Sequence, residues 1–191
     1  MQEDIHKQIM EASKDLFGRY GFTKTTMQEI ASECRMSAAN IYRFFDGKKD
    51  ILAAIVTELF QDDQETLRGI ARKKDLTASQ KIMAFTLAML GHTYELDLDT
   101  PRIREACNFI CEERFDIVLQ HKEVKKSILA EILAEGNRSG EFHVSDIIAT
   151  ATDILNATMI CQYPNFATYY PREELEKMTE GIVKLLLRGL R

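Results

Sequence analysis

The sequence predicts an all-α fold in which a three-helix head at the N-terminus precedes a larger helical body. The chain has nine glycines and three prolines in 191 residues, so long stretches of helix-forming residues run uninterrupted. Apolar residues recur at three- and four-residue spacing, which is the period of an amphipathic helix. Capping residues stand where several of these stripes begin. We therefore expect about nine helices, with the head over residues 1–47 and the body over residues 48–191.

Two predicted helices frame the head. The first spans residues 2–20, where Ile9 and Phe17 share an apolar stripe and Gly21 gives a stop signal. The other spans residues 48 to about 72 and carries a second apolar stripe. This longer helix connects the head to the body, so any signal between them must cross it.

Two short capped helices lie between these elements. Thr26 can accept a hydrogen bond from the backbone N–H of Glu29 while the Glu29 carboxylate reaches back, which is a capping box. Ser37 is the expected cap of a second helix over residues 38–45. Two such helices joined by a turn are typical of a helix-turn-helix, whose second helix enters the major groove of DNA. A corner used for packing alone is the alternative interpretation.

The second short helix carries side chains that suit a major groove. Asn40 can recognise adenine, Arg43 can recognise guanine or neutralise a phosphate, and small alanines permit a close approach. The Tyr42 hydroxyl and the Lys48 ammonium can reach phosphates beside these base contacts. The pattern therefore predicts a DNA-binding surface centred on this helix.

Three motifs follow one another within residues 5–59: Thr-Met-x-x-Ile-Ala, Met-Ser-x-x-Asn-Ile-Tyr-Arg-Phe-Phe and Lys-Lys-Asp-Ile-Leu. Together they resemble the DNA-binding domain of the TetR family of bacterial transcriptional regulators. The resemblance implies DNA-facing positions at the start of the first short helix, against base edges and beside phosphates. In that order these are Thr25, Thr26 and Gln28, then Ser37, Ala38, Ala39 and Asn40, then Tyr42, Phe44 and Lys48.

Two positions depart from the family pattern. Arg35 stands in the turn where members usually have glycine, and a non-glycine residue in a left-handed conformation costs about 1 kcal/mol. Phe44 stands where members usually have histidine, and its side chain has no hydrogen-bond donor for a phosphate. We therefore expect Phe44 to make packing or apolar contacts.

The charge distribution agrees with a DNA-binding head. The whole chain has a net charge of -5, yet residues 1–49 hold eight basic and seven acidic residues. The remainder holds 17 basic and 23 acidic residues. Positive charge is thus relatively concentrated where we expect the DNA contact.

In the body, Thr77 or Ser79 can cap a helix that extends to about residue 95. Further helices are expected over residues 102–121, 124–137, 145–162 and 172–190, with a loop at 96–102. The last two carry more apolar positions than one exposed face needs, which favours a four-helix interface between two copies of the chain. A completed monomer core is the alternative. The candidate interface residues are Ile147, Ala151, Ile154, Leu155, Thr158, Leu175, Met178, Ile182, Leu185 and Leu186. A two-fold dimer would set two recognition helices about 34 Å apart on a palindrome.

The middle helices would enclose a small-molecule pocket if the protein responds to a ligand. The candidate lining residues are Phe60, Phe85, Met89, His92, Cys107, Cys111, Phe115, Asn156 and Met159. Ordinary core packing is the alternative for each of them. Cys107 and Cys111 share a helix face, but zinc needs about four ligands and a reactive thiol needs a lowered pKa, so two packed cysteines fit better. We expect no metal, no cofactor and no structural disulfide.

Several classes of protein are not expected. The sequence has no Gly-x-Gly-x-x-Gly, P-loop, His-Glu-x-x-His or Gly-x-Ser-x-Gly motif, which argues against an enzyme. Its polar N-terminus is unlike a signal peptide, and no apolar run approaches the roughly 20 residues of a membrane span. We therefore expect a cytoplasmic protein.

The sequence as a whole predicts a DNA-binding transcriptional regulator that binds a palindromic operator as a homodimer. The resemblance further implies that it is a repressor released by a small-molecule inducer in the C-terminal domain. The alternative is a helical protein-protein adaptor that binds an unlike partner through its apolar C-terminal helices and has no sequence-specific DNA binding.

Overall fold

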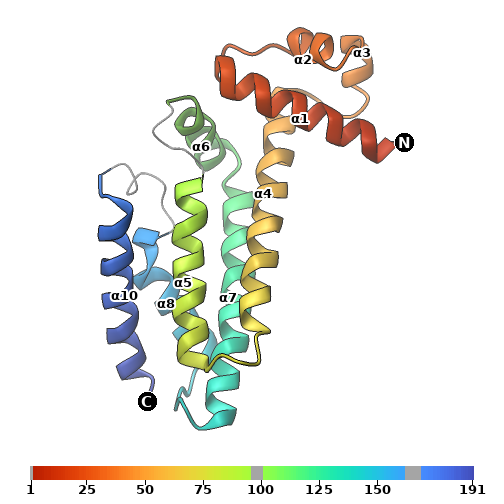
Figure 1. Ribbon diagram of the computed structural model, residues 1–191. Helices are drawn as coiled ribbons and strands as arrows, with labels where there is room; N and C mark the ends of the chain where they lie inside the picture. Colours follow the sequence, from red (N-terminus) through yellow and green to blue (C-terminus); the bar gives the residue numbers. More distant parts are fainter. Residues whose placement is uncertain (1, 96–100, 162–168) are drawn as a thin grey trace. The chain divides into compact units, whose positions relative to one another are not determined.

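The computed structural model describes residues 2–95, 101–161 and 169–191 (Figure 1). Over these ranges the chain forms nine α-helices and one 3-10 turn, and no strand. The elements are α1 (Gln2–Tyr20), α2 (Met27–Glu33), α3 (Ala38–Ile41), α4 (Lys48–Ala71), α5 (Ala78–Glu95), α6 (Pro101–Glu113), α7 (Phe115–Ser139), α8 (Ile147–Ala157), η1 (Met159–Cys161) and α10 (Arg172–Gly189). The predicted all-α fold is confirmed.

The chain divides into two compact units, which we call the head unit and the body unit. The head unit comprises residues 1–61 and 99–118, and the body unit comprises residues 62–98 and 119–191. The head unit is larger than the predicted head, because it includes the first part of α4 and all of α6. Helices α4 and α7 each supply residues to both units.

One apolar cluster holds the head unit together. Ile9 of α1, Ile30 of α2, Ile41 of α3, Ile51 of α4 and Ile110 of α6 are all buried in it. Helices as short as α2 and α3 are not stable alone in water, since each has too few hydrogen bonds to offset the cost of nucleation. Burial of these side chains against the longer helices supplies the missing stability.

A second apolar cluster fills the body unit. It contains Leu67 of α4, Phe85 of α5, Leu129 of α7, Ile154 of α8 and Val183 of α10, all at most 2% exposed. Figure 1 shows α5, α7, α8 and α10 as the helices of this bundle. A residue from each helix thus meets in one core.

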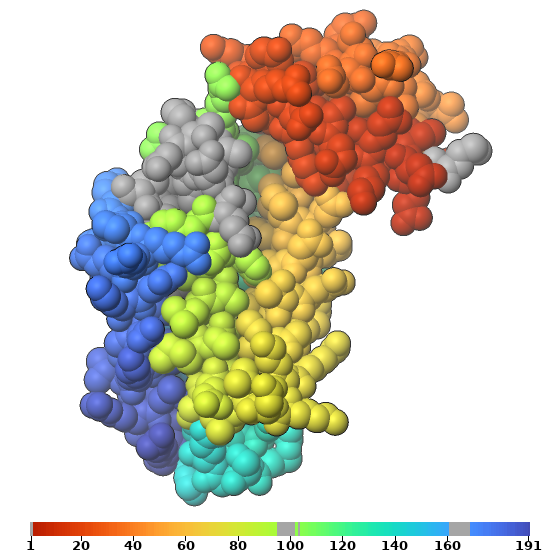
Figure 2. Space-filling view, in the orientation of Figure 1, coloured from red at the N-terminus to blue at the C-terminus, as the bar shows by residue number. Residues whose placement is uncertain are grey.

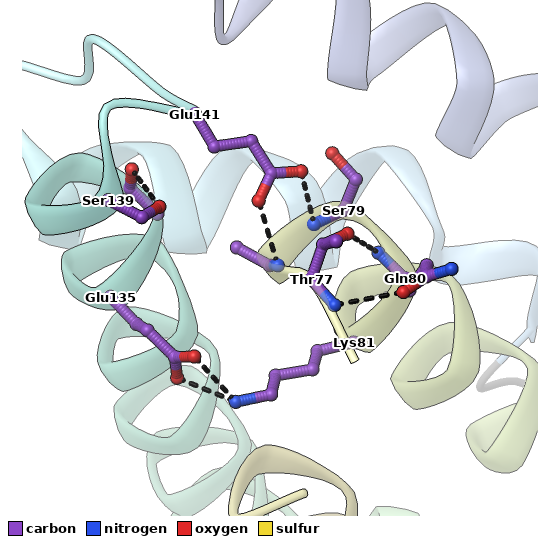
Figure 3. A network of polar contacts seen from close by, with 9 residues as sticks. Thr77, Ser79, Gln80, Lys81, Glu135, Ser139 and Glu141 are labelled. Atoms are coloured by element: carbon purple, nitrogen blue, oxygen red, sulfur yellow. Dashed lines mark hydrogen bonds and ion pairs between the residues drawn. The ribbon is translucent and has the colours of Figure 1, made fainter. Parts of the chain in front are cut away.

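Polar contacts fix the start of α5 in the body unit (Figure 3). The Glu141 carboxylate accepts hydrogen bonds from the backbone N–H groups of Ala78 at 2.9 Å and Ser79 at 3.0 Å. Partial burial opposes ionisation, but these bonds outweigh it and lower the pKa of Glu141. One turn further, the buried Lys81 ammonium lies 2.7 Å from both carboxylate oxygens of Glu135. The carboxylates of Glu135 in α7 and Glu141, which follows α7, therefore hold the N-terminus of α5.

The break predicted between residues 121 and 124 is wrong. Helix α7 runs without interruption from Phe115 to Ser139, and α6 ends at Glu113. Lys122 and Glu123 are good helix formers, so nothing ends the helix there. The break lies instead at Arg114, whose guanidinium donates two hydrogen bonds of 3.0 Å to Asp116 at the start of α7.

Two other predicted helices are shorter in the structure. Helix α3 ends at Ile41 rather than at residue 45, and α8 ends at Ala157 and is followed by η1. Residue 162 and the predicted loop over residues 96–100 lie outside the described residues. Pro101 begins α6, where its fixed φ suits a first helical turn.

Candidate nucleic-acid interface

Helix α2 begins with the predicted capping box. The Glu29 N–H donates to the Thr26 hydroxyl oxygen at 3.2 Å, and the Thr26 N–H donates to the Glu29 carboxylate at 2.8 Å. The backbone hydrogen bond from Thr26 lowers the pKa of Glu29. Gln28 and Thr26 are exposed at this helix start. The capping prediction is confirmed, and it fixes the direction in which α2 leaves the preceding loop.

The turn between α2 and α3 depends on Arg35. Its φ is 55°, the left-handed region that favours glycine. The Arg35 N–H donates to the Ser32 carbonyl at 3.0 Å, and the Met36 N–H donates to the Ala31 carbonyl at 2.8 Å. These bonds satisfy the last carbonyls of α2 and turn the chain toward α3. The strained conformation expected at Arg35 is therefore present.

Helix α3 presents polar and small side chains outward. Ser37 caps it by accepting a hydrogen bond of 3.2 Å from the Asn40 N–H, and Ile41 is fully buried beneath it. Ala39 and Arg43 are exposed, and Tyr42 is 53% exposed. Figure 2 shows that exposed parts of the segment containing α2 and α3 lie at the surface of the head unit. Because Ile41 anchors this helix, Ala39, Tyr42 and Arg43 remain exposed to a partner.

A shallow hollow lies over α3, and we call it the recognition hollow. It is lined by Arg35, Met36, Ser37, Ala39, Asn40 and Arg43. Four of these are predicted DNA-binding residues, and the structure brings them together on one surface. Asn and Arg tips beside an alanine supply hydrogen-bonding groups and space for base edges.

Two predicted DNA contacts make hydrogen bonds within the head unit. Thr25 is 1% exposed, and its hydroxyl donates to the Gly21 carbonyl at 2.8 Å. The Lys48 ammonium donates to the carbonyls of Phe22, Thr23 and Thr25 at 2.9, 2.8 and 3.0 Å. All three of its N–H donors are therefore used within the protein. Within the protein, both residues therefore brace the loop between α1 and α2.

Phe44 packs against the head core as a partly buried side chain. This agrees with the expectation of a packing role, because its ring is directed to apolar neighbours. Phe44 and the exposed Tyr42 thus differ in environment although they are two residues apart.

Helix α6 holds the same loop from another direction, a contact that the sequence does not predict. The Thr23 N–H donates to the Glu105 carboxylate at 3.2 Å, and the Thr23 hydroxyl also bonds that carboxylate. The Arg102 guanidinium donates to the Gly18 carbonyl at 3.0 Å near the end of α1. These partners are more than 80 residues apart in the chain, and no local pattern indicates the pairing.

The candidate ligand residues are divided between the two units. Phe60, Cys107, Cys111 and Phe115 belong to the head unit, whereas Phe85, Met89, His92, Asn156 and Met159 belong to the body unit. Phe85 and Met89 are buried in the body core, as the packing alternative expects. Asn156 is exposed and accepts a hydrogen bond of 3.1 Å from Lys122.

Neither Cys107 nor Cys111 shows a sign of activation. Burial, and next the neighbouring Cys111, raise the pKa of the Cys107 thiol to about 11. Burial also raises the pKa of Cys111. Raised thiol pKa values oppose redox reactivity at neutral pH, which favours the packing role that the spacing suggested.

The body unit contains a buried polar cluster that the sequence pattern does not predict. Asp63 of α4 lies 2.9 Å from Nε2 of His121 and 3.6 Å from Nζ of Lys125, both on α7, and it also bonds Nδ1 of His92 on α5. Gln64 Nε2 lies 3.2 Å from the other ring nitrogen of His121. Across the described residues, no group of three or more His, Cys, Asp or Glu side chains is arranged to hold a metal ion.

Half of the candidate dimer residues are buried within the chain itself, as the alternative of a completed monomer core expects. Burial in the protomer core leaves them no surface for a second copy. These residues are Ala151, Ile154, Leu155, Thr158 and Leu175. Leu185 of α10 is 66% exposed, and Ile148 of α8, which was not a candidate, is 56% exposed. The apolar surplus on these helices therefore serves mainly the monomer core.

An exposed helix-turn-helix ahead of a helical body defines a DNA-binding regulator of the helix-turn-helix class. The family model "Bacterial regulatory proteins, tetR family" matches residues 9–55, and the model "Tetracyclin repressor-like, C-terminal domain" matches residues 78–183. The chain belongs to the TetR family of helix-turn-helix transcriptional regulators.

Three known proteins illustrate what this chain is similar to in sequence or in structure. The probable HTH-type transcriptional regulator YttP of Bacillus subtilis (strain 168) is 23% identical over 144 residues, which are 68% of this chain and 70% of that protein. A TetR/AcrR-family regulator from Thermobifida fusca has a TM-score of 0.72 at 23% identity, covering 98% of this chain and 99% of that chain. SmeT, the repressor of the Stenotrophomonas maltophilia multidrug efflux pump SmeDEF, has a structure with triclosan that gives a TM-score of 0.68 at 14% identity, covering 98% and 92%. No described helix is both long and apolar enough to span a membrane.

Proposed function

We propose that this regulator binds a palindromic operator as a homodimer, with α3 and the start of α2 in the major groove. The observation that carries the proposal is the recognition hollow, where Asn40 and Arg43 line an exposed surface over a capped and anchored helix. The proposed contacts are Thr26, Gln28, Ser37, Ala38, Ala39, Asn40, Tyr42 and Arg43.

Selection of bound sequences from a random duplex pool tests this proposal. A palindrome with half-sites about one helical turn apart is the expected result. Asn40→Ala should relax preference at one base position by about 1 to 3 kcal/mol, whereas Tyr42→Phe should weaken binding evenly across sequences. If no sequence is enriched, the adaptor alternative replaces this function.

The homodimer is supported by exposed apolar side chains on the last long helices, Ile148 on α8 and Leu185 on α10. A charge at such a position cannot be buried between two copies without a large desolvation cost. Leu185→Glu should therefore give a monomer in sedimentation equilibrium and lose operator affinity. Leu119→Glu, at an exposed leucine of α7, is the matched control and should remain dimeric. A dimeric Leu185→Glu protein would exclude this interface.

Repression with release by a small molecule in the C-terminal domain is the regulatory part of the proposal. Its support is the family membership and the triclosan complex of the structural neighbour SmeT. A ligand shifts the DNA-binding equilibrium by no more than its difference in affinity between the two protein states. Compounds that raise the melting temperature should therefore be assayed for operator release. Equal operator binding with and without every stabilising compound would contradict ligand control.

A further inference from the structure

A second hollow on the head unit adjoins the recognition hollow, and the two share Arg43. Its other lining residues are Gln2, Glu3 and His6 of α1, together with Phe44, which follows α3. We call it the α1 hollow. Arg43 therefore stands between the surface proposed to face base edges and a surface built from the first two turns of α1.

The imidazole of His6 is held in the α1 hollow by ring stacking. It lies over the Phe45 ring with 4.2 Å between centroids and 35° between planes. Phe45 is 3% exposed and belongs to the head core, so it gives the imidazole a fixed support. Within the described part of the chain, the side chains of His6 and Arg43 make no hydrogen bond or ion pair with another protein group. The nitrogens on the ring edge and the guanidinium N–H groups therefore remain for a ligand.

The chemistry of the α1 hollow suits an anionic oxygen. Arg43 has five N–H donors and no acceptor, and an imidazole N–H is a second donor in the same hollow. Charge-assisted hydrogen bonds of this kind to phosphate oxygens are stronger than bonds between neutral groups. Phe44 adds an apolar wall, and the Glu3 carboxylate opposes an anion.

We propose that the α1 hollow binds a backbone phosphate of duplex DNA, with Arg43 and His6 as its donors. This inference rests on the proposed entry of α3 into the major groove. Phosphate contacts lie beside base contacts and fix the register of a protein on the duplex. Since Arg43 borders both hollows, the α1 hollow is placed for the strand next to the bases that α3 faces. Helix α1 thereby becomes part of the DNA-binding surface.

Substitutions at two residues of the α1 hollow should act in opposite directions. His6→Phe keeps an aromatic ring over Phe45 but removes the donor, so operator affinity should fall by about threefold to tenfold. His6→Gln keeps a donor and should lose less. Glu3→Gln removes the opposing charge and should raise the affinity by up to about fivefold. Fluorescence anisotropy with full-length protein and the selected operator measures all four affinities.

A scan with methylphosphonates identifies the phosphate itself, because each replacement removes the charge of one phosphate without changing the bases. At one position beside each half-site, neutralisation should weaken wild-type binding more than it weakens binding by the His6→Phe protein, which keeps only the Arg43 contact to that phosphate. The loss for His6→Phe and Arg43→Gln combined should also be smaller than the sum of the single losses, since both contact one phosphate. Asn40→Ala combined with His6→Phe is the additive control.

Three results would overturn the α1 hollow as a phosphate site. The first is wild-type affinity in His6→Phe. The second is an equal response of both proteins to every methylphosphonate. The third is an equal loss in His6→Phe and His6→Gln together with a lowered melting temperature, which would show a packing role. Because a phosphate contact does not depend on sequence, His6→Phe should also weaken binding to a random duplex. If the wild-type protein shows no sequence preference, the proposed function is contradicted. The comparison of wild type with His6→Phe on a random duplex would still test the phosphate site.

Discussion

Asp63 and His121 form a buried hydrogen bond of 2.9 Å between α4 and α7 in the body unit. His121 accepts from the Gln64 amide on its other nitrogen, at 3.2 Å, so the ring is neutral and donates through Nε2 to the Asp63 carboxylate. Burial opposes ionisation of Asp63, but hydrogen bonds from His121 and His92 outweigh it and hold the pKa of Asp63 far below its usual range. An ionised carboxylate is thus balanced by donors from two helices and by Lys125.

The neutral form of His121 predicts a loss of stability in mild acid. Burial, and next repulsion from Lys125, lower its pKa despite the attraction of Asp63. The unfolded chain therefore takes up a proton near pH 6.5 that the folded chain does not bind, so the free energy of unfolding falls as the pH drops below about 6.5. We expect a decrease of about 1 kcal/mol between pH 7 and pH 5. Urea unfolding at several pH values measures it.

His121→Gln is the control for this pH dependence, because glutamine does not titrate and can still donate to Asp63. Its unfolding free energy should vary less over the same pH interval. The lowered pKa of Asp63 contributes stability that is present above about pH 3.9 and is lost at lower pH, so it does not affect this window. An unchanged pH profile in His121→Gln would exclude His121 as the cause.

Substitutions at Lys48 and Arg43 should distinguish a loss of head stability from a loss of DNA contact. Lys48→Met removes three hydrogen bonds to loop carbonyls and the contact of Nζ with the Phe22 ring at 4.9 Å. It should lower the unfolding free energy by about 2 kcal/mol and weaken DNA binding as a consequence. Arg43→Met should weaken DNA binding at unchanged stability, because Arg43 is exposed. Equal stability of the two variants would mean that Lys48 does not brace the loop.

The sequence predicted those features that depend on residues close together in the chain. The capping box at Thr26 and the Ser37 cap each join residues three positions apart, and both are present. The family resemblance placed Thr25 and Lys48 at DNA-facing positions. Their contact with each other in the structure joins residues 23 positions apart, through a carbonyl that carries no sequence signal. The Asp63 cluster was not predicted for the same reason, since its members come from three helices, α4, α5 and α7.

Arg35→Gly should stabilise the head unit. Arg35 has a φ of 55°, where a side chain is strained and glycine is not. The unfolding free energy should rise by about 1 kcal/mol, less the greater chain entropy that glycine gives to the unfolded state. Arg138→Gly in the exposed part of α7 is the matched control and should lower it by about 1 kcal/mol. Urea midpoints of both proteins measure the difference, and a fall in both would argue against strain at Arg35.

The contact between Gly136 of α7 and Phe142 should make the substitution Gly136→Ala destabilising. A Cβ added to Gly136 would lie 2.1 Å from Cδ2 of Phe142, whose ring is 1% exposed and enclosed in the body core. The ring cannot move without displacing its neighbours, so Gly136→Ala should lower the unfolding free energy by about 1 to 3 kcal/mol.

Gly181→Ala gives the opposite expectation within the same unit. An added Cβ on Gly181 of α10 would meet no atom within 4 Å, so alanine should raise the unfolding free energy by about 0.5 to 1 kcal/mol through its better helix propensity.

Combining Gly136→Ala with Phe142→Leu should recover part of the stability that Gly136→Ala loses, because the smaller side chain gives space to the added methyl group. Stabilisation by Gly136→Ala alone would show that Phe142 does not pack on that glycine.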